Sequence, residues 1–357
     1  MIPIKYKKRM FEAHRELWTE LLVKAVPQTD LGRGKTNSSN IPNLGHTQLK
    51  DLLLQRYKKR FCIFTDCATD ALDLVVSCID APAWYVPSYT WFSPVNAIAK
   101  SGKEIRFLDV HPESRMVDYS SYDPRFPIIV PHVDGRASPP PPERKAFVLE
   151  DAAQSPLNKN IGFGDAVVLS FGSSKRLGLL GQGGCILTDN EELATRLQRL
   201  TVFGLEGTQV LIEPGYKSFF DPYNSLCTQE IYKLYDERDY LARIDRIIEA
   251  YNDASGVSNP PGLERYTIQV KDRARFRSFF EERGIETRVW FKSHSARHPA
   301  YAGLNLKGAD RLPVSDLVSE RSVDVPLNEY LTDGEVEQIC DALKSSKDLI
   351  IPTEELL

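Results

Sequence analysis

The stretch FVLEDAAQS occupies residues 147–155, and the stretch SFGSSK follows at residues 170–175. Short apolar runs that end in polar residues are typical of strands leaving the core of an α/β sheet. Open α/β sheets bind ligands at the carboxyl ends of their strands, so we expect Asp151 to face a ligand there. Lys175 leads into the glycine-rich segment 178–184 and can project into the same crevice. A partly desolvated lysine amine is what Schiff-base chemistry needs.

Short apolar runs and helical patterns alternate between residues 60 and 200. Several of the runs lack polar alternation, which is typical of strands buried on both faces of a mainly parallel sheet. Helices are predicted at 69–79, capped by Thr69 or Asp70, and at 190–200. The pattern predicts a layered α/β domain. The expected strands lie at 61–66, 84–87, 105–110, 127–133, 146–150, 166–171 and 185–188.

A second unit is predicted towards the end of the chain. Residues 230–251 are charged with apolar residues at helical spacing, which predicts one long connecting helix. The segment 259–262 then breaks the chain with two prolines and a glycine. We therefore expect a large domain over residues 1–230, with an N-terminal helical segment, and a connecting helix plus small α/β domain over 231–357. Elements expected in the small domain are strands at 266–270 and near 287–291, and helices at 274–283 and 333–344.

Composition limits the class of protein. The chain has 357 residues, 42% hydrophobic and 26% charged, which suits a globular enzyme. Its net charge of −4 gives no overall attraction to nucleic acid or anionic membrane, although a local nucleic-acid patch stays open. We find neither a run long enough to span a bilayer nor an apolar stretch behind the charged N-terminus. A cytoplasmic protein without a membrane segment is expected.

The cysteines and histidines do not predict a metal site. Their spacing matches neither a zinc pair nor a dense disulfide framework, and there is no HExxH motif. We expect reduced, packed thiols. The residues concerned are Cys62, Cys67, Cys78, Cys185, Cys227 and Cys340, and His14, His46, His111, His132, His294 and His298.

Together the motifs resemble pyridoxal-phosphate enzymes of fold type I, specifically the DegT/StrS-type nucleotide-sugar aminotransferases. The resemblance spans most of the chain. It rests on the segment 148–154, on SFGSSK at 170–175, on the glycine-rich run continuing to 189, and on VPSYTW at 86–91. Residues 312–315 and 325–332 resemble the family's C-terminal pattern. The implied fold is a large domain with a mainly parallel mixed sheet flanked by helices, plus a small C-terminal α/β domain.

The resemblance also implies roles for individual residues. Asp151 is the carboxylate at the pyridine nitrogen, where a negative charge favours the protonated ring. Lys175 forms the Schiff base with pyridoxal 5'-phosphate and moves protons during the reaction. Trp91 stacks on the cofactor ring, Ser170 contacts the phosphate, and Gln154 belongs to the same cofactor-binding motif.

The expected phosphate site departs from the family pattern. Family members place a Gly-Thr pair at the start of a helix, and here the pair is Ala68 and Thr69. A carboxylate, Asp66, stands where a small polar residue is usual, and it opposes a phosphate unless it points away. Asn224 resembles the asparagine that reaches the phosphate from the partner subunit, which implies a homodimer with shared active sites. The arginine that usually follows is Leu226.

The leading hypothesis is an aminotransferase that moves an amino group from an amino acid, glutamate or glutamine, to a keto group of a nucleotide-linked sugar. His294 stands near the position of a family histidine close to the nucleotide, and we list it as a candidate substrate contact. One alternative is a pyridoxal-phosphate lyase or decarboxylase that acts on an amino acid attached to a larger molecule such as a modified nucleotide. Another is a non-catalytic homologue, against which the retained Asp151 and Lys175 argue.

Overall fold

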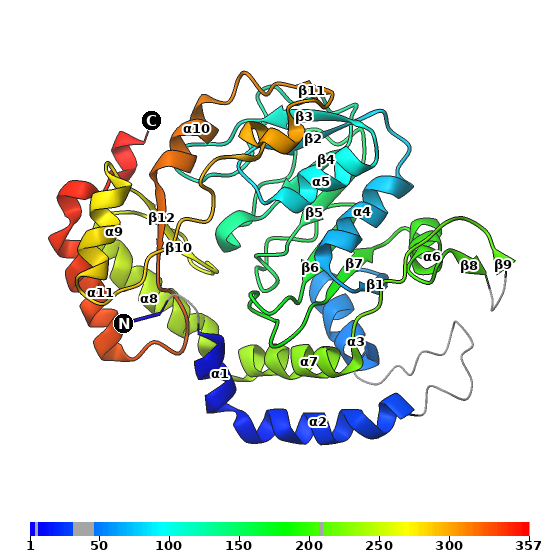
Figure 1. Ribbon diagram of the computed structural model, residues 1–357, viewed down its shortest axis with the longest axis horizontal. Helices are drawn as coiled ribbons and strands as arrows, with labels where there is room; N and C mark the ends of the chain where they lie inside the picture. Colours follow the sequence, from blue (N-terminus) through cyan, green and yellow to red (C-terminus); the bar gives the residue numbers. More distant parts are fainter. Residues whose placement is uncertain (4–5, 31–45, 207–209, 357) are drawn as a thin grey trace.

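An eight-stranded mixed sheet forms the centre of the computed structural model, which describes residues 1–3, 6–30, 46–206 and 210–356 (Figure 1). The strand order is β1, β7, β6, β5, β4, β2, β3, β11, and β7 runs antiparallel to both of its neighbours while the other pairs are parallel. This confirms the mainly parallel mixed sheet. The strands are β1 (Phe61–Thr65), β2 (Ala83–Pro87), β3 (Glu104–Leu108), β4 (Ile128–Pro131), β5 (Val148–Asp151), β6 (Ala166–Ser170), β7 (Gly184–Thr188) and β11 (Leu306–Lys307).

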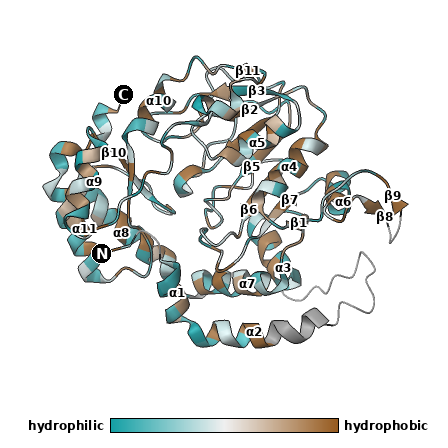
Figure 2. Ribbon diagram, in the orientation of Figure 1, coloured by the Kyte–Doolittle hydropathy of each residue, from teal (hydrophilic) through white to brown (hydrophobic). Residues whose placement is uncertain are grey.

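Helices cover both faces of this sheet, as the solid apolar runs require. In β6, Ala166 and Val168 join one core with α4 (Ala68–Cys78), α5 (Phe92–Lys100) and α6 (Glu191–Leu200). The alternate residues Val167 and Leu169 join the other core, with α2 (Arg15–Asp30), α3 (His46–Tyr57) and α7 (Pro222–Glu237). Figure 2 shows apolar residues gathered along the strands and on α4 and α5. The sheet is therefore a buried middle layer whose carboxyl-terminal edge is left for a ligand.

The predicted helix at 69–79 exists, but its cap differs from the expectation. The side chain at the N-cap belongs to Cys67, whose sulfur accepts a hydrogen bond from the backbone N–H of Asp70. Thr69 and Asp70 already lie inside the first turn of α4. The predicted cap was therefore wrong by two or three residues, because the chain turns into the helix directly after β1. In α6, by contrast, Asn190 caps the helix by accepting from the N–H of Leu193.

The C-terminal unit lies beside the sheet and contains an antiparallel pair, β10 (Tyr266–Gln269) and β12 (Ser322–Val325) (Figure 1). The predicted strand near 287–291 was wrong: this segment makes one isolated bridge, between Arg288 and Asp324, and then leaves the sheet edge. The helices packed around the pair are α8 (Tyr240–Ser255), α9 (Arg273–Glu281), α10 (Pro313–Arg321) and α11 (Asp333–Ser345).

The connection between the units is also different from the prediction. Instead of one helix over 230–251, α7 ends at Glu237 and α8 begins at Tyr240, because Arg238 has an extended backbone. Helix α7 packs on α2 and α3, whereas α8 packs on α11. The expected boundary between residues 230 and 231 falls inside α7. The division into domains at that point stays a prediction.

One α-helix near the N-terminus and one short hairpin complete the α-helices and strands of the described chain. They are α1 (Lys7–Ala13) and the short hairpin of β8 (Leu205–Glu206) and β9 (Val210–Leu211). In the described part of the chain, we find no helix that combines the length and apolar character needed to cross a membrane.

Candidate active site

A cavity of about 180 Å³, here called the cofactor cavity, opens at the carboxyl ends of β1, β2, β4, β5 and β6. Parallel strands end at the same edge of a sheet, and this edge gathers side chains that are far apart in the sequence. Two predicted site residues, Asn224 and His294, lie outside the cavity lining. The seven that line it are Ala68, Thr69, Trp91, Asp151, Gln154, Ser170 and Lys175.

Asp151 ends β5 with a buried carboxylate in this cavity. The preceding strand residue, Glu150, turns to the other side, where it bonds the ring of His132 and two backbone N–H groups. Within the described chain, the carboxylate of Asp151 accepts one hydrogen bond, from the N–H of Ala153 at 3.1 Å. Burial raises the pKa of Asp151. A buried carboxylate with so few partners favours a cationic ligand group.

Lys175 lies in a tight turn after β6 that exposes its amine to the cavity. Its N–H donates to the carbonyl of Gly172, and its own carbonyl accepts from the N–H of Gly178. The side chain is only partly exposed, and burial lowers the pKa of Lys175. A lowered pKa increases the neutral, nucleophilic fraction of the amine at neutral pH. The amine of Lys175 and the carboxylate of Asp151 thus line the same cavity.

The ammonium of Lys7, from α1, fastens the turn that carries Lys175. Its Nζ donates to the carbonyls of Arg176 at 3.2 Å and Gly178 at 2.5 Å. The residues are about 170 positions apart, so no local sequence signal indicated this contact. Burial lowers the pKa of Lys7 to about 8. Lys7 is a positioning residue, because it acts through the backbone next to Lys175.

Replacing Lys7 with Met is expected to lower turnover by about tenfold, which corresponds to about 1.4 kcal/mol lost in positioning. Lys7 should also contribute stability that increases between pH 8 and 10.5, because the unfolded chain there binds a proton that the folded Lys7 has lost. The free energy of unfolding of the wild type relative to Lys7→Met should therefore rise over this range. Denaturant unfolding at both ends of this range tests the sign. The variant should lack this gain, whereas Lys50→Met, at an exposed position on α3, should keep it. Equal pH dependence of the Lys7 variant and the wild type would contradict the assignment.

The amino end of α4 forms the opposite wall of the cofactor cavity. Cys67, Ala68 and Thr69 line the cavity there, and the hydroxyl of Thr69 shares a hydrogen bond of 2.9 Å with Ser93. Strand β7 approaches this helix end so closely that a Cβ on Gly184 would lie 2.6 Å from the nitrogen of Ala68. Backbone N–H groups at a helix amino end attract anions. The wall is thus suited to a phosphate, although Ala68 stands in place of glycine.

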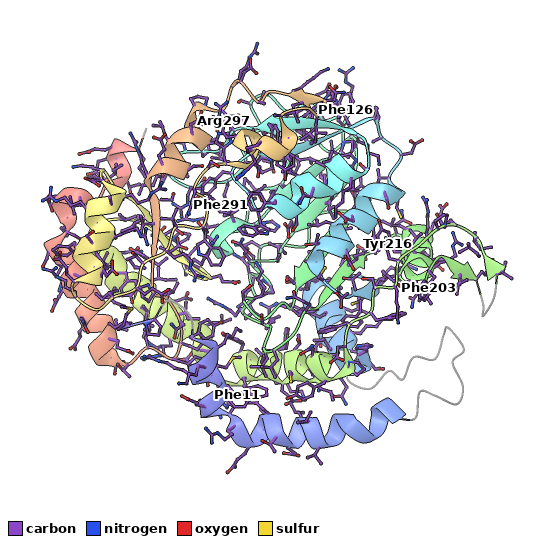
Figure 3. All side chains as sticks on the ribbon, in the orientation of Figure 1. Phe11, Phe126, Phe203, Tyr216, Phe291 and Arg297 are labelled. Carbon is purple, nitrogen blue, oxygen red and sulfur yellow. The ribbon has the colours of Figure 1, made fainter. Side chains whose placement is uncertain are left out.

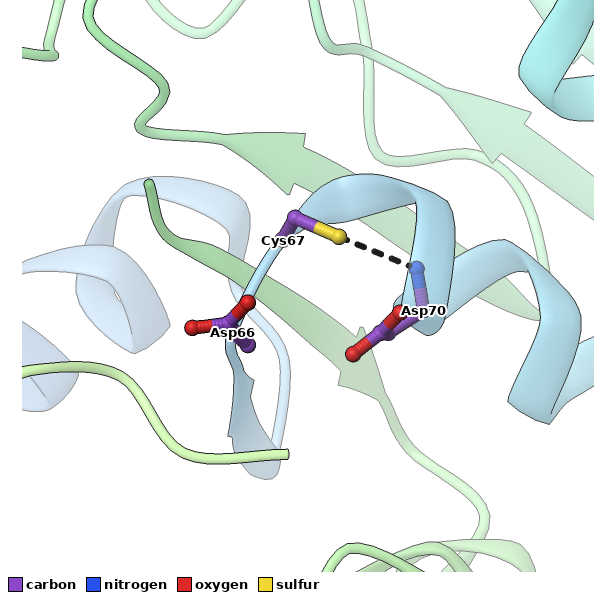
Figure 4. Close-up of side chains that lie close together, drawn as sticks. All are labelled: Asp66, Cys67 and Asp70. Carbon is purple, nitrogen blue, oxygen red and sulfur yellow. Dashed lines mark hydrogen bonds between the residues drawn. The ribbon is translucent and has the colours of Figure 1, made fainter. Parts of the chain in front are cut away.

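The carboxylate of Asp66 is exposed and lies outside the cavity lining, so it does not oppose a phosphate there. Figure 4 shows it beside Cys67 and Asp70, with one potential ligand atom of each residue within 4.8 Å of the others. Hydrogen bonds within the chain explain this grouping. Asp70 accepts from the hydroxyl of Ser218, which in turn accepts from the N–H of Asp66. These hydrogen bonds stabilise the first turn of α4.

The amide of Gln154 has a defined orientation, which sequence reasoning alone could not give. Its oxygen accepts from the N–H of Asp134 at 3.0 Å and from the guanidinium of Arg265 at 2.7 Å. Because both partners are donors, the accepting atom is the oxygen, and the amide nitrogen is left to donate. Arg265 also pairs with the carboxylate of Asp134. The prediction missed Arg265, since it lies over 100 residues from Gln154 in the other unit.

Trp91 lines the cofactor cavity and lies close to aromatic residues of the C-terminal unit. It is 41% exposed and has its ring centroid 6.3 Å from that of Trp290. Phe291, labelled in Figure 3, packs edge-on against Tyr89 at 4.7 Å. The exposed face of Trp91 is thus available for a flat ligand ring. Its stacking role stays a prediction.

Asn224 and His294 have other surroundings. Asn224 lies in the first turn of α7 with its amide against Gly181, where an added Cβ would overlap it. His294 is buried, and its two ring nitrogens bond Ser88 and, at 2.8 Å, Asp316. Both nitrogens of this ring are therefore used within the chain. The expected contacts of Asn224 with a partner's cofactor and of His294 with substrate stay predictions.

Two curated proteins that this chain resembles are both named as aminotransferases that act on sugars. The chain is 25% identical over 328 residues to UDP-2-acetamido-2-deoxy-3-oxo-D-glucuronate aminotransferase of Pseudomonas aeruginosa, covering 83% of this chain and 89% of that protein. It is 27% identical over 296 residues to 3-oxo-glucose-6-phosphate:glutamate aminotransferase of Bacillus subtilis, covering 72% and 67% of the two chains.

Comparison with solved structures supports the fold. A DegT DnrJ EryC1 StrS aminotransferase from Brucella abortus matches with a TM-score of 0.85 and 22% identity, covering 97% of this chain and 99% of that one. The model of the DegT/DnrJ/EryC1/StrS aminotransferase family matches residues 142–344, which is more than half of the chain and includes both Asp151 and Lys175. The chain therefore belongs to the DegT/DnrJ/EryC1/StrS aminotransferase family.

Proposed function

We propose that this aminotransferase uses pyridoxal 5'-phosphate to move an amino group from an amino acid to a keto group of a nucleotide-linked sugar. The observation that carries the proposal is one cavity with the amine of Lys175 and the carboxylate of Asp151 both in its lining. The two relatives described above carry names of sugar aminotransferases, which supports a sugar acceptor. A cytoplasmic location, expected from the composition, belongs to the same proposal.

The residues of the cofactor cavity fit pyridoxal phosphate. Asp151 presents a buried carboxylate with one internal hydrogen bond, which suits a protonated ring nitrogen. The amino end of α4 suits the phosphate, with Thr69 and Ser170 as side-chain donors in the same lining. The face of Trp91 suits the ring. The ring nitrogen, the phosphate and the ring face of the cofactor therefore each have suitable residues in the cavity lining.

Pyridoxal phosphate, when bound, supplies an electron sink that stabilises negative charge at the carbon next to the reacting nitrogen. Asp151 keeps the ring nitrogen protonated, because a nearby negative charge favours the cationic form. With the cofactor bound, Lys175 would hold it and, as a free amine, would move a proton between Cα of the amino acid and C4′ of the cofactor. The oxygen of Gln154 is held by Arg265, which leaves the amide nitrogen available to donate to a ligand in the cavity. The chain thus supplies the anchor, the proton carrier and the charge control.

The function is tested with purified holoenzyme and a panel of amino donors. Glutamate or glutamine should convert the bound cofactor to its pyridoxamine form, seen as a change in absorbance. Adding keto sugars linked to a nucleotide should reverse the change and yield an amino sugar, identified by mass spectrometry. The proposal would be contradicted if no donor converted the cofactor, or if carbon dioxide were released without an amino-sugar product. Either result would favour a lyase or decarboxylase.

We further propose a homodimer with shared active sites. Asn224 supports it, because its side chain lies against Gly181 and outside the cofactor cavity of its own chain. A mixture of Lys175→Ala and Asn224→Ala subunits, each inactive alone, should regain activity. In a mixed dimer, one site keeps both Lys175 and the partner's Asn224 intact.

The mixing test needs verified heterodimers, prepared with two affinity tags. Recovery should reach at most half of the wild-type activity per dimer, because one of the two sites is restored. A mixture of Lys175→Ala subunits that carry the two tags is the control and should stay inactive. An active monomer in analytical ultracentrifugation, or inactive verified heterodimers, would contradict the shared site and leave Asn224 as a helix-start residue.

A further inference from the structure

A second cavity, of about 410 Å³, adjoins the cofactor cavity at Lys175. It shares Gln154, Ser174 and Lys175 with the cofactor cavity, so the two spaces meet at the reactive amine. The N-terminal segment and the C-terminal unit close it, through residues such as Tyr6 and Trp290. A space of this size is in the range of small-molecule sites. A ligand that fills it can place one atom at Lys175.

Most charged groups around the second cavity already have partners. The amine of Lys7 is used by two backbone carbonyls. The guanidinium of Arg265 is held by Asp134 and Gln154 and lies 3.8 Å from Asp324. Asp324 accepts from the hydroxyl of Thr267 through Oδ1, whereas its Oδ2, 3.8 Å from Arg265, has no hydrogen-bond partner in the described chain. These groups shape the cavity, and their charges are largely balanced within the chain.

Arg288 is a cation without such a balance. Among the described residues, no carboxylate pairs with its guanidinium, which lies 4.9 Å from the ring centroid of Trp290 and lines the second cavity. Its backbone is fixed by two hydrogen bonds with Asp324. A guanidinium held on an aromatic face and left without a counter-ion is suited to carboxylate or phosphate.

Glu264 contributes a negatively charged group to the lining of the same cavity. Its Oε2 is buried and, within the described chain, has no hydrogen-bond partner. Its N–H is fixed to the carbonyl of Asp134, and its side chain lines the second cavity. A buried carboxylate oxygen without a partner is costly, so it calls for a donor from a ligand. Within this cavity, a hydroxyl group of a ligand can provide that donor.

We propose that the second cavity holds the keto-sugar acceptor, with an anionic group of the sugar substrate on Arg288 and a sugar hydroxyl on the free oxygen of Glu264. This inference rests on the proposed amino transfer. It assigns Arg288 to a negatively charged group within reach of the sugar ring, which is a phosphate, a carboxylate or a linked diphosphate. Leu179, Val325 and Leu327 add the apolar part of the wall.

Binding to the holoenzyme tests the anionic contact without turnover. Isothermal titration calorimetry is carried out with glucose, glucose 6-phosphate, glucuronate and UDP-glucose. At least one anionic compound should bind more tightly than glucose. Arg288→Gln should lower the affinity for that compound by about 10- to 150-fold, as expected for loss of a charge-assisted hydrogen bond. The compound whose affinity falls in Arg288→Gln identifies which anionic group contacts Arg288.

The matched control is Arg275→Gln, which removes the same charge from an exposed position on α9. It should bind every compound as the wild type does. If Arg288→Gln also binds them all like the wild type, the anionic contact is overturned. If the wild type transfers no amino group from any donor while Arg288→Gln still weakens binding, the proposed function fails and the anion site stands.

The hydroxyl contact is tested with monodeoxy forms of the tightest compound. One of them should bind less tightly to the wild type, and the same deletion should cost nothing in Glu264→Ala, because coupled groups give non-additive effects. Glu264→Gln provides a second variant of nearly unchanged volume. If every deoxy compound loses the same affinity in wild type and both variants, Glu264 does not bind the sugar.

Discussion

Replacing Lys175 with Ala is expected to reduce amino transfer by at least about a thousandfold. The residue is proposed to act both as covalent anchor and as proton carrier, and general acid–base catalysis alone contributes about 10²- to 10⁴-fold. The fold should survive, because the side chain projects from a turn into a cavity and fills no part of the core. Single-turnover rates together with circular dichroism separate the two effects.

Borohydride reduction of the wild-type holoenzyme locates the anchor. After reduction and digestion, mass spectrometry should find the cofactor attached to the peptide that contains Lys175. Lys159→Ala removes an exposed lysine elsewhere on the large unit and should change neither result. A labelled peptide that carries any other lysine, or a Lys175→Ala variant with normal turnover, would contradict the assignment.

Asp151→Asn is expected to keep the cofactor and lose most of the activity. A neutral amide cannot hold a proton on the ring nitrogen by charge, and an adjacent opposite charge shifts a pKa by about 1 to 3 units. At about 1.4 kcal/mol for each unit, the expected loss is roughly 10- to 1000-fold in turnover. Cofactor content is measured by absorbance, and turnover is measured on the same sample.

Asp66→Asn is the control for this substitution. Asp66 also follows a strand at the carboxyl edge of the sheet, but its carboxylate is exposed and outside the cofactor cavity. Its variant should match the wild type in both measurements. Normal turnover in Asp151→Asn would show that this carboxylate does not control the ring nitrogen.

The sheet and the core of the site were predictable because they depend on local patterns. Solid apolar runs occur where strands are buried on both faces, and each of the seven expected strands exists within a few residues of its predicted ends. Polar residues that end such strands meet at one edge, which is why Asp151, Ser170 and Lys175 share a cavity. Here, distance along the sequence is no obstacle, since the sheet itself brings the strand ends together.

The second cavity was not predictable for the opposite reason. Glu264, Arg265 and Arg288 stand among many charged residues of the C-terminal unit, and none has a local pattern that separates it from a solvated surface charge. Their importance arises from the docking of that unit against the large sheet. The expected strand near 287–291 is likewise reduced to a single bridge, between Arg288 and Asp324.

The contacts of Arg265 have a consequence for recombination among relatives. This residue belongs to the C-terminal unit, but its buried ion-pair partner Asp134 and its hydrogen-bond partner Gln154 belong to the large unit. Consider a chimaera that joins the large unit of this chain to the C-terminal unit of a relative that lacks this arginine. In that chimaera the buried carboxylate of Asp134 would lose its ion pair with Arg265 and keep only the one with Arg115. The two units are therefore matched at this junction, and we expect a stable chimaera to need both sides of the Asp134–Arg265 contact.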